Sequence, residues 1–240
     1  MKKYKHKYLA SLIIICISFL SGCVTKNNIE NYSYALGLEM KGLYTLMSKE
    51  HLLRDYPPID SMGNINVVVE IPTGTNEKWE VDKNTGHLKW ELKGGRSRVV
   101  SYLGYPGNYG MIPGTLLPKE LGGDGDPLDV IIIGSAVPRG SIVQVRPIGM
   151  LKLLDDGEQD DKIVAVILNS ELGSVLSIDE LKQKYNGVAK ILQIWFSNYK
   201  GAGRLQSQGF EGRDAALKVI NTAINAYRNE LFTTELSFSG

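Results

Sequence analysis

Three aspartates lie within six positions, at Asp124, Asp126 and Asp129, and the chain then runs into four consecutive β-branched residues, Val130 to Ile133. This pattern predicts a loop that leads into a buried strand. The glycine and the proline between the aspartates favour a tight backbone turn, so we expect the carboxylates to face one point. Carboxylates that converge repel one another unless a cation lies between them. Oxygen ligands on a compact loop favour Mg²⁺, Mn²⁺ or Ca²⁺ over zinc.

An acidic turn before a strand is also an ordinary structural feature, because Asp, Gly and Pro are the commonest turn formers. The loop is not an EF-hand, since it lacks the glycine and the glutamate that such a loop needs. A second acidic segment, residues 155–161, favours the metal interpretation. Asp155 and Asp160 flank its turn, between predicted strands at 141–154 and 162–168. Several divalent ions held by such carboxylates are the usual apparatus for displacement at phosphorus.

A phosphate substrate also needs cationic and hydroxyl partners. The chain offers Lys78, Arg96, Arg98, Lys162 and Lys200 together with Tyr105, Tyr109 and Tyr199. Taken singly, each of these residues is more often a solvated or core-packing side chain. Other catalytic routes find no support, because the three histidines are isolated and the chain has neither a Walker loop nor a nucleophile elbow.

The segment Asp124-Gly-Asp-Pro-Leu-Asp129 resembles the signature of the soluble family I inorganic pyrophosphatases. Further segments agree with this family in order and approximate spacing, at residues 69–72, 78–83, 105–110, 155–162 and 198–200. The resemblance implies an α+β fold with a small OB-like five-stranded β-barrel, additional strands and flanking C-terminal helices. The periodicity independently favours six or seven short strands, among them 65–71 and 99–103, followed by two or three helices. These helices are predicted after a capping box that begins at Ser177, at 188–199 and at 214–231.

The resemblance also implies a role for each matching residue. Several Mg²⁺ ions, or alternatively Mn²⁺, would be held by Asp124, Asp129, Asp155 and Asp160, while Asp126 would orient and deprotonate the attacking water. Pyrophosphate would be held by Lys78, Arg98, Tyr109, Tyr199 and Lys200, with Glu70, Glu80, Tyr105 and Lys162 as supporting polar groups.

The arginine is the least direct of these assignments. The family places it about eight residues before the tyrosine that matches Tyr105, where this chain has Ser97 between Arg96 and Arg98. We predict Arg98, because alternation in a strand from Arg98 to Leu103 keeps it beside the pocket, and Arg96 is the alternative. The segment from Gly86 to Tyr105 is longer than in short bacterial members of the family.

The first 22 residues have the features of a secretory signal peptide. Four lysines precede an apolar run at residues 9–20, and Leu20-Ser21-Gly22-Cys23 resembles the bacterial lipobox, in which the cysteine becomes the lipidated first residue. The apolar run is shorter than the roughly 20 residues that a permanent membrane span needs. We therefore expect Cys23 to anchor the protein to a membrane of the bacterial cell envelope, outside the cytoplasm on the periplasmic face or the cell surface.

Residues 23–56 are predicted to form a tether and a docking helix, because the apolar residues from Leu36 to Met47 have helix-like spacing. Residues 57–240 are predicted to form one catalytic domain. Without the signal peptide the chain carries 23 basic and 26 acidic residues, so nothing indicates nucleic-acid binding. Exposed hydrophobic surface could seal a homo-oligomer, but the sequence does not show which face.

Two other functions use the same residues. One is hydrolysis of short polyphosphates or nucleotides, which the lack of a base-stacking platform or ribose-binding motif disfavours. The other is a surface protein that only binds Ca²⁺, which has no need for Lys78, Tyr109, Tyr199 and Lys200. The sequence therefore favours an enzyme that hydrolyses inorganic pyrophosphate to two phosphates with the help of metal ions.

Overall fold

The structure is a computed structural model that describes residues 34–119 and 123–238, with side chains described up to residue 232. The predicted signal peptide, Cys23 and the first part of the tether lie outside the described residues. All the described residues fall in one compact unit. None of the helices in these two ranges is both long enough and apolar enough to span a membrane.

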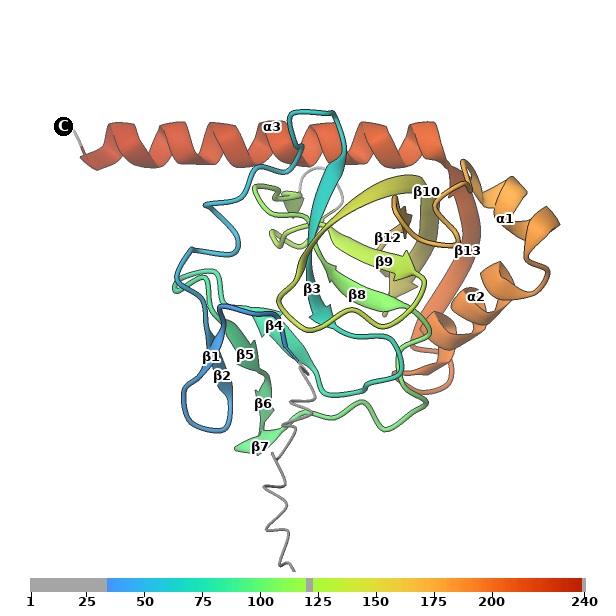
Figure 1. Ribbon diagram of the computed structural model, residues 1–240, viewed down its shortest axis with the longest axis horizontal. Helices are drawn as coiled ribbons and strands as arrows, with labels where there is room; N and C mark the ends of the chain where they lie inside the picture. The colour runs from blue at the N-terminus through green and yellow to red at the C-terminus, as the bar shows by residue number, and fades with distance from the viewer. Residues whose placement is uncertain (1–33, 120–122, 239–240) are drawn as a thin grey trace, which may run out of the picture. The chain divides into compact units, whose positions relative to one another are not determined.

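Five strands form the central body of the molecule (Figure 1). They pair in the order β3 (Ile65–Ile71), β8 (Asn108–Met111), β9 (Asp129–Ile133), β12 (Lys162–Ile167) and β10 (Ile142–Asp155), and β10 pairs again with β3. The pairings therefore close into a ring, in which only β9 and β12 run parallel. These strands confirm the predicted β-segments at 65–71, 141–154 and 162–168 and the α+β class.

A small four-stranded sheet carries the first described residues. Its order is β1 (Glu39–Met40), β2 (Thr45–Met47), β5 (Leu88–Trp90) and β4 (Trp79–Val81), and a separate hairpin of β6 (Leu92–Lys93) and β7 (Arg96–Ser97) follows it. Its buried residues Leu46, Trp79 and Leu88 pack with Leu52 and Leu53.

The docking helix predicted from Leu36 to Met47 is wrong, because this segment forms β1 and β2 instead. Gly37 and Gly42 adopt positive φ angles of 88° and 67°, which a right-handed helix cannot contain. Leu36 and Leu43 are exposed, so the apolar residues with helix-like spacing do not share one buried face.

The predicted strand from Val99 to Leu103 is also wrong. Val99 forms an isolated antiparallel bridge to Glu77, and residues 101–103 form bends. Beside this bridge the N–H of Val100 donates to the carbonyl of Asn76 at 2.8 Å. Pairing in this segment is therefore limited to a bridge and does not extend into a strand.

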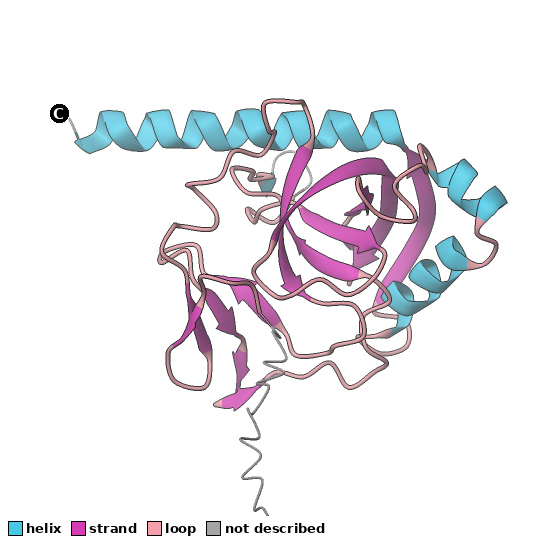
Figure 2. Ribbon diagram, in the orientation of Figure 1, coloured by secondary structure: helices cyan, strands magenta, loops and turns pink. Residues whose placement is uncertain are grey.

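Three helices lie outside the strands (Figure 2). α1 (Ile178–Lys184) begins after Ser177, whose hydroxyl accepts a hydrogen bond from Glu180 N at 3.1 Å, which confirms the predicted cap. α2 (Val188–Asn198) buries Trp195 and Phe196 against the barrel, and α3 (Arg213–Phe238) runs along another side. The sequence did not indicate β13 (Leu205–Gly212), which pairs with β10, or the short β11 (Glu158–Gln159).

Candidate active site

The acidic loop before β9 is folded by its own polar groups. The N–H of Asp126 donates to Asp124 Oδ1 at 2.9 Å, which closes a tight turn around Gly125, whose φ is +83°. The N–H of Leu128 donates to the hydroxyl of buried Thr115 at 3.1 Å, which fixes the end of the loop to the chain before it. The loop therefore presents its carboxylates from a constrained backbone, as the glycine and proline pattern predicts.

Two parallel strands bring Asp129 and Lys162 together. Val130 pairs with Ile163, so the residues that begin β9 and β12 lie side by side. Lys162 Nζ lies 2.5 Å from Asp129 Oδ2 and 2.5 Å from Asp160 Oδ1, and its side chain is 4% exposed. Burial lowers the pKa of Lys162, but the two carboxylates raise it by more, so the ammonium stays charged between them.

The two ends of the loop differ in electrostatics. Burial raises the pKa of Asp129, but Lys162, Lys78 and a hydrogen bond from the Tyr109 hydroxyl outweigh this effect, and the net pKa is lowered. Burial also raises the pKa of Asp124, and the nearby carboxylates of Asp126 and Asp129 raise it further. Asp129 is thus stabilised as an anion, whereas added positive charge beside Asp124 would be favourable.

The β10–β12 hairpin supplies the second acidic group. Its turn uses Asp156 and Gly157 in left-handed conformations, with φ of 49° and 92°. Lys200, just beyond α2, places its Nζ 2.5 Å from Asp155 Oδ2 and 3.9 Å from Asp160 Oδ2. Asp155 Oδ1 is buried and has no hydrogen-bond partner. The predicted approach of Asp155 and Asp160 is confirmed, with a lysine between them.

Lys78, Tyr105, Tyr109 and Tyr199 lie close together beside Asp129, to which the Tyr109 hydroxyl donates a hydrogen bond, and we call these four residues the lysine wall. The ring centroid of Tyr105 lies 5.3 Å from that of Tyr109 and 6.3 Å from that of Tyr199. Burial raises the pKa of all three tyrosines, so their hydroxyls remain hydrogen-bond donors at neutral pH. Lys78 Nζ lies 5.3 Å from the Tyr109 ring centroid and 2.7 Å from Glu80 Oε1.

Arg98 lies closer to this wall than Arg96. Its Nη1 is 2.6 Å from Glu91 Oε2. Burial lowers the pKa of Arg98, whereas Glu91 and the Tyr199 and Tyr105 hydroxyls raise it by more, which places the guanidinium near those rings. Arg96 is exposed on β7. The preference for Arg98 is therefore supported by position, although the strand used to predict it is absent, and its role in binding phosphate stays a prediction.

Glu70 is a buried carboxyl on the central strand β3. Its Oε1 accepts a hydrogen bond from Val81 N at 2.7 Å. Burial raises its pKa to about 8, and the neighbouring Lys78 limits the increase. Glu70 is therefore mainly protonated at neutral pH, in contrast to Asp129, whose pKa is lowered.

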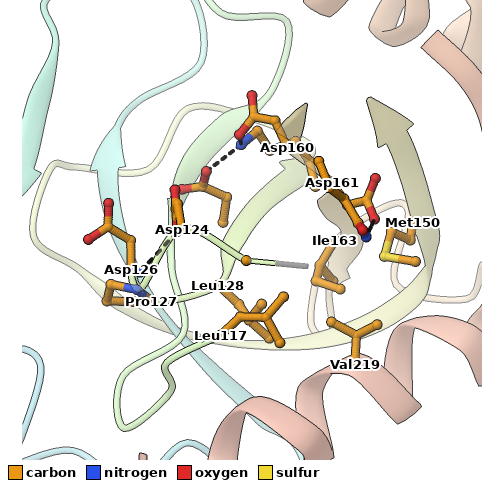
Figure 3. Close-up of a pocket in the computed structure, with 14 residues that line it drawn as sticks. Leu117, Asp124, Asp126, Pro127, Leu128, Met150, Asp160, Asp161, Ile163 and Val219 are labelled. Carbon is orange, nitrogen blue, oxygen red and sulfur yellow. Dashed lines mark hydrogen bonds and ion pairs between the residues drawn. The ribbon is translucent and has the colours of Figure 1, made fainter. Parts of the chain in front are cut away.

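Two cavities meet at the loop. The larger has a volume of about 450 Å³ and is lined mainly by charged residues, among them Glu70, Lys78, Glu80, Lys83, Lys89, Glu91, Asp126 and Asp129. Of the predicted substrate-binding residues Lys78 lines it, whereas Arg98, Tyr109, Tyr199 and Lys200 do not. The smaller, of about 40 Å³, lies between Asp124, Asp129, Asp160 and Lys162 and an apolar floor that includes Leu117, Leu128 and Val219 (Figure 3). It has room for water-sized species only, so the larger cavity is the candidate substrate space.

The residues fit a divalent metal, although their present pairing differs from the expected cluster. Among the described residues no three carboxylate, imidazole or thiol groups lie together as a metal site, because Lys162, Lys200 and Lys83 pair with the acids. The donors are nevertheless all hard oxygens. Asp155 Oδ1 is buried without a partner, and Asp124 forms no ion pair within the described chain.

Sequence reasoning missed two residues of the site, Lys83 and Glu91. Lys83 pairs with Asp126, and Glu91 pairs with Arg98. The motif that contains Lys78 also contains Lys83, but its spacing does not reveal that the side chain crosses to the acidic loop. The alternation in the strand that begins at Leu88 could have placed Glu91 on the same side as Lys89, but only the tertiary structure identifies its partner.

Comparison with known proteins gives a consistent result. Residues 67–228 match the family model described as inorganic pyrophosphatase. The chain is 36% identical over 177 residues to an inorganic pyrophosphatase of Gluconobacter oxydans, covering 71% of this chain and 95% of that one. It is 37% identical over 177 residues, 65% of its own length, to inorganic pyrophosphatase 1 of Caenorhabditis elegans, but it spans only 42% of that protein.

Solved structures of inorganic pyrophosphatases also resemble this chain in fold. A type I inorganic pyrophosphatase from Toxoplasma gondii superposes with a TM-score of 0.72 at 26% identity, over 80% of this chain and 97% of that chain. The inorganic pyrophosphatase from Thermus thermophilus superposes with a TM-score of 0.63 at 28% identity, over 75% and 99%.

Proposed function

The chain belongs to the inorganic pyrophosphatase family, and on this basis we propose that it is an enzyme that hydrolyses inorganic pyrophosphate to two phosphates with Mg²⁺ as its preferred metal. Membership makes it a hydrolase and implies a divalent metal cofactor. The observation that carries the proposal is the cavity of about 450 Å³, whose acidic edge at Asp126 and Asp129 faces the lysine wall at Lys78. A diphosphate with bound cations matches this distribution of charge.

We propose that the lysine wall holds the phosphate oxygens. Lys78 is nearly buried and Arg98 is fixed by Glu91, so both cations are oriented before substrate arrives. Tyr109 and Tyr199 keep their protons and donate hydrogen bonds, and Lys200 reaches the hairpin carboxylates from α2. Glu70, Glu80, Tyr105 and Lys162 support these groups by pairing with them or packing against them.

The proposed metal ligands are Asp124, Asp129, Asp155 and Asp160. Bound divalent ions would neutralise phosphate charge and lower the pKa of the attacking water. Asp126 lines both cavities and its side chain is 53% exposed, so it can accept the proton of that water. As the water oxygen bonds to phosphorus, the bridging P–O bond breaks and the second phosphate leaves with that bond's electron pair.

We further propose the finer features that the sequence suggests. The five-stranded ring follows the OB-like arrangement of the family, and the protein is exported and anchored through lipid on Cys23. The support for the anchor is the Leu20-Ser21-Gly22-Cys23 segment. A Cys23→Ser variant should accumulate as unprocessed precursor without incorporated lipid label, and normal processing and labelling would refute the anchor.

One assay tests the activity against its alternatives. Phosphate release is measured from pyrophosphate, tripolyphosphate and ATP, each with Mg²⁺, Mn²⁺, Ca²⁺ or EDTA. We expect pyrophosphate with Mg²⁺ to be the best combination and EDTA to abolish release. Faster release from tripolyphosphate or ATP would favour the broader hydrolase, and Ca²⁺ binding without any release would favour a binding protein.

A further inference from the structure

Two hairpin tips lie at one end of the small four-stranded sheet, residues 41–44 between β1 and β2 and residues 92–96 in β6 and β7. The N–H of Trp90 donates to the carbonyl of Tyr44 at 2.9 Å, and the two rings lie 6.2 Å apart. Leu92 follows Trp90 by two residues, so the second tip begins beside the first. Figure 1 draws both tips away from α3. We call these two segments the hairpin face.

The hairpin face combines exposed apolar and basic side chains. Leu43 is 74% exposed and Leu92 is 49% exposed. The same segments contain Lys41, Lys93 and Arg96 and no acidic residue. All three basic residues are exposed, and none of them forms an ion pair within the described chain. Apolar side chains can insert into the headgroup region of a bilayer, and neighbouring unpaired cations can bind anionic lipid headgroups.

The proposed anchor keeps this face within reach of lipid. Ten residues separate Cys23 from Tyr34, and a fully extended chain of that length spans at most about 40 Å. The described chain is fixed to the domain where it begins, since the N–H of Ala35 donates to the carbonyl of Arg139 at 2.7 Å. β1 starts five residues after Tyr34 and leads directly into the first tip.

The first tip lies outside the residues that the family model matches. That model matches residues 67–228, whereas β1 and β2 end at Met47. The second tip, residues 92–96, lies within the matched range.

We propose that the hairpin face lies on the surface of a bilayer that contains anionic lipid. Leu43 and Leu92 enter the headgroup region, and the three basic side chains contact lipid phosphates. The inference rests on the proposed lipid anchor, because an anchor alone leaves the domain free to rotate while a second contact fixes its orientation. The occupant is lipid and not a second copy of the chain, since the unpaired charges of the face are all positive and would repel the same face of another copy.

Site-specific fluorescence on the lipidated protein tests this. The mature chain has no free thiol if Cys23 carries lipid, so Leu43→Cys and Leu92→Cys each introduce a single labelling site for an environment-sensitive dye. Asn225→Cys, exposed on α3, is the matched control. Each labelled protein is placed in phosphatidylcholine vesicles with or without phosphatidylglycerol, and nitroxide-bearing lipids serve as quenchers.

We expect blue-shifted emission and quenching by nitroxide lipids at positions 43 and 92 but not at 225, with the effect stronger when phosphatidylglycerol is present. Combining Lys41→Glu with Lys93→Glu should abolish most of the quenching at position 92, whereas Lys190→Glu, exposed on α2, should leave it unchanged. Phosphate release by each labelled variant shows that the domain remains folded.

Equal, water-like emission at all three positions overturns the inference. Shielding at 43 and 92 without lipid quenching, together with self-crosslinking through those cysteines, would mean that a second copy covers the face, and the inference would be wrong. A thiol test on the unsubstituted protein distinguishes a failure of the lipid anchor from a failure of the inference about the hairpin face. If it reacts with a thiol reagent, Cys23 is not lipidated, and the hairpin face is then tested with Cys16→Ser and Cys23→Ser in the same vesicles.

Discussion

Asp129 and Asp126 lie three positions apart on one loop, yet their surroundings differ. Asp129 begins β9 and contacts Lys162 and Tyr109, with Lys78 nearby. Asp126 lies in the turn, with its side chain 53% exposed, and within the described chain it pairs only with Lys83, which is equally exposed. We call Asp129, Asp160 and Lys162 the buried half of the site, after the lysine that is 4% exposed between carboxylates that are 32% and 21% exposed. Asp126 and Lys83 are the open half.

The difference has a backbone origin. In the buried half, Asp129 and Lys162 are the first residues of two parallel strands, and Asp160 lies in a hairpin. A shift of any of these three residues would therefore disturb the barrel. The backbone of Asp126 is held by hydrogen bonds to Asp124 and Leu117, but this turn lies outside the ring and leaves the side chain half exposed. A carboxylate fixed by several cations is suited to hold a metal ion, and one that can leave its partner is suited to accept a proton.

The largest expected effect separates these two roles. Asp126→Asn keeps the size of the side chain but removes the proton acceptor, and general base catalysis is typically worth about 10² to 10⁴-fold. We predict a fall in kcat within that range at saturating Mg²⁺. Asp129→Asn should instead raise the Mg²⁺ concentration needed for half-maximal activity. Measuring kcat and Mg²⁺ titrations for both variants side by side checks the distinction.

The division between the halves fails if Asp126→Asn turns over at nearly the normal rate, or if added Mg²⁺ restores its activity. Either result would make Asp126 a ligand or a bystander. A solvent-exposed control such as Asp179→Asn, on α1 and paired only with Lys182, should change neither quantity.

The second prediction concerns the stability of the buried half. Lys162→Met leaves Asp129 and Asp160 without their shared cation, and breaking a buried ion pair typically costs about 3 to 5 kcal/mol. We expect the free energy of unfolding in EDTA to fall by at most that amount, because water reaches part of both carboxylates, which are 32% and 21% exposed. Mg²⁺ should restore part of the loss, since a bound cation neutralises the same carboxylates. Chemical denaturation with and without metal measures both effects.

Lys152→Met is the matched control for this variant. Lys152 pairs with Asp161 on the same hairpin, but the side chain of Asp161 points away from that of Asp160 (Figure 3). Its loss should destabilise the protein without any recovery on adding Mg²⁺. Recovery in both variants would show that metal stabilises the hairpin in general and not the buried half.

The sequence predicted which residues lie near one another at the site better than how they pair. Strand and helix periods located the barrel strands β3, β9, β10 and β12 and the three helices but not β8, and the spacing of the aspartates indicated converging carboxylates. What lies between them was not predictable, because the lysines that pair with Asp126, Asp129 and Asp155 come from elements up to 45 positions away. Long-range pairing depends on the register of β9 with β12, which no local pattern encodes.

The errors have local physical causes. Apolar spacing from Leu36 to Met47 suggested a helix, but the two glycines with positive φ allow turns that spacing does not report. β13 was missed because its alternating residues, from Leu205 to Gly212, are mostly polar and partly exposed. Its strand character comes from pairing with β10, which is a tertiary contribution.

The third prediction uses the pKa of Glu70. Burial raises this pKa from 4.5 to about 8, so between these values the folded protein holds a proton that the unfolded chain has lost. The contribution to stability is therefore fully present below pH 4.5 and is lost as the pH rises to about 8, with a slope of up to about 1.4 kcal/mol per pH unit. Glu70→Gln retains the acceptor for Val81 N and should remove this slope.

Denaturation of both proteins in EDTA across this pH range checks the prediction. The stability of Glu70→Gln relative to the parent should increase as the pH rises and then level off. A constant difference would mean that Glu70 is ionised in the folded protein, and the buried half would then extend to the lysine wall through a charged pair with Lys78.

The smallest expected effect concerns how much the exposed Lys83–Asp126 pair contributes to stability. Both side chains of the Lys83–Asp126 pair are about half exposed, and exposed ion pairs contribute about 0 to 1 kcal/mol. Lys83→Met should therefore lower the free energy of unfolding by less than about 1 kcal/mol, and the difference should shrink at high salt. Lys182→Met, which breaks a pair with Asp179 that is at least half exposed on both sides, is the matched control. If Lys83→Met costs as much as Lys162→Met under the same denaturation conditions, Asp126 is held as firmly as Asp129, and exposure does not distinguish the base from the ligands.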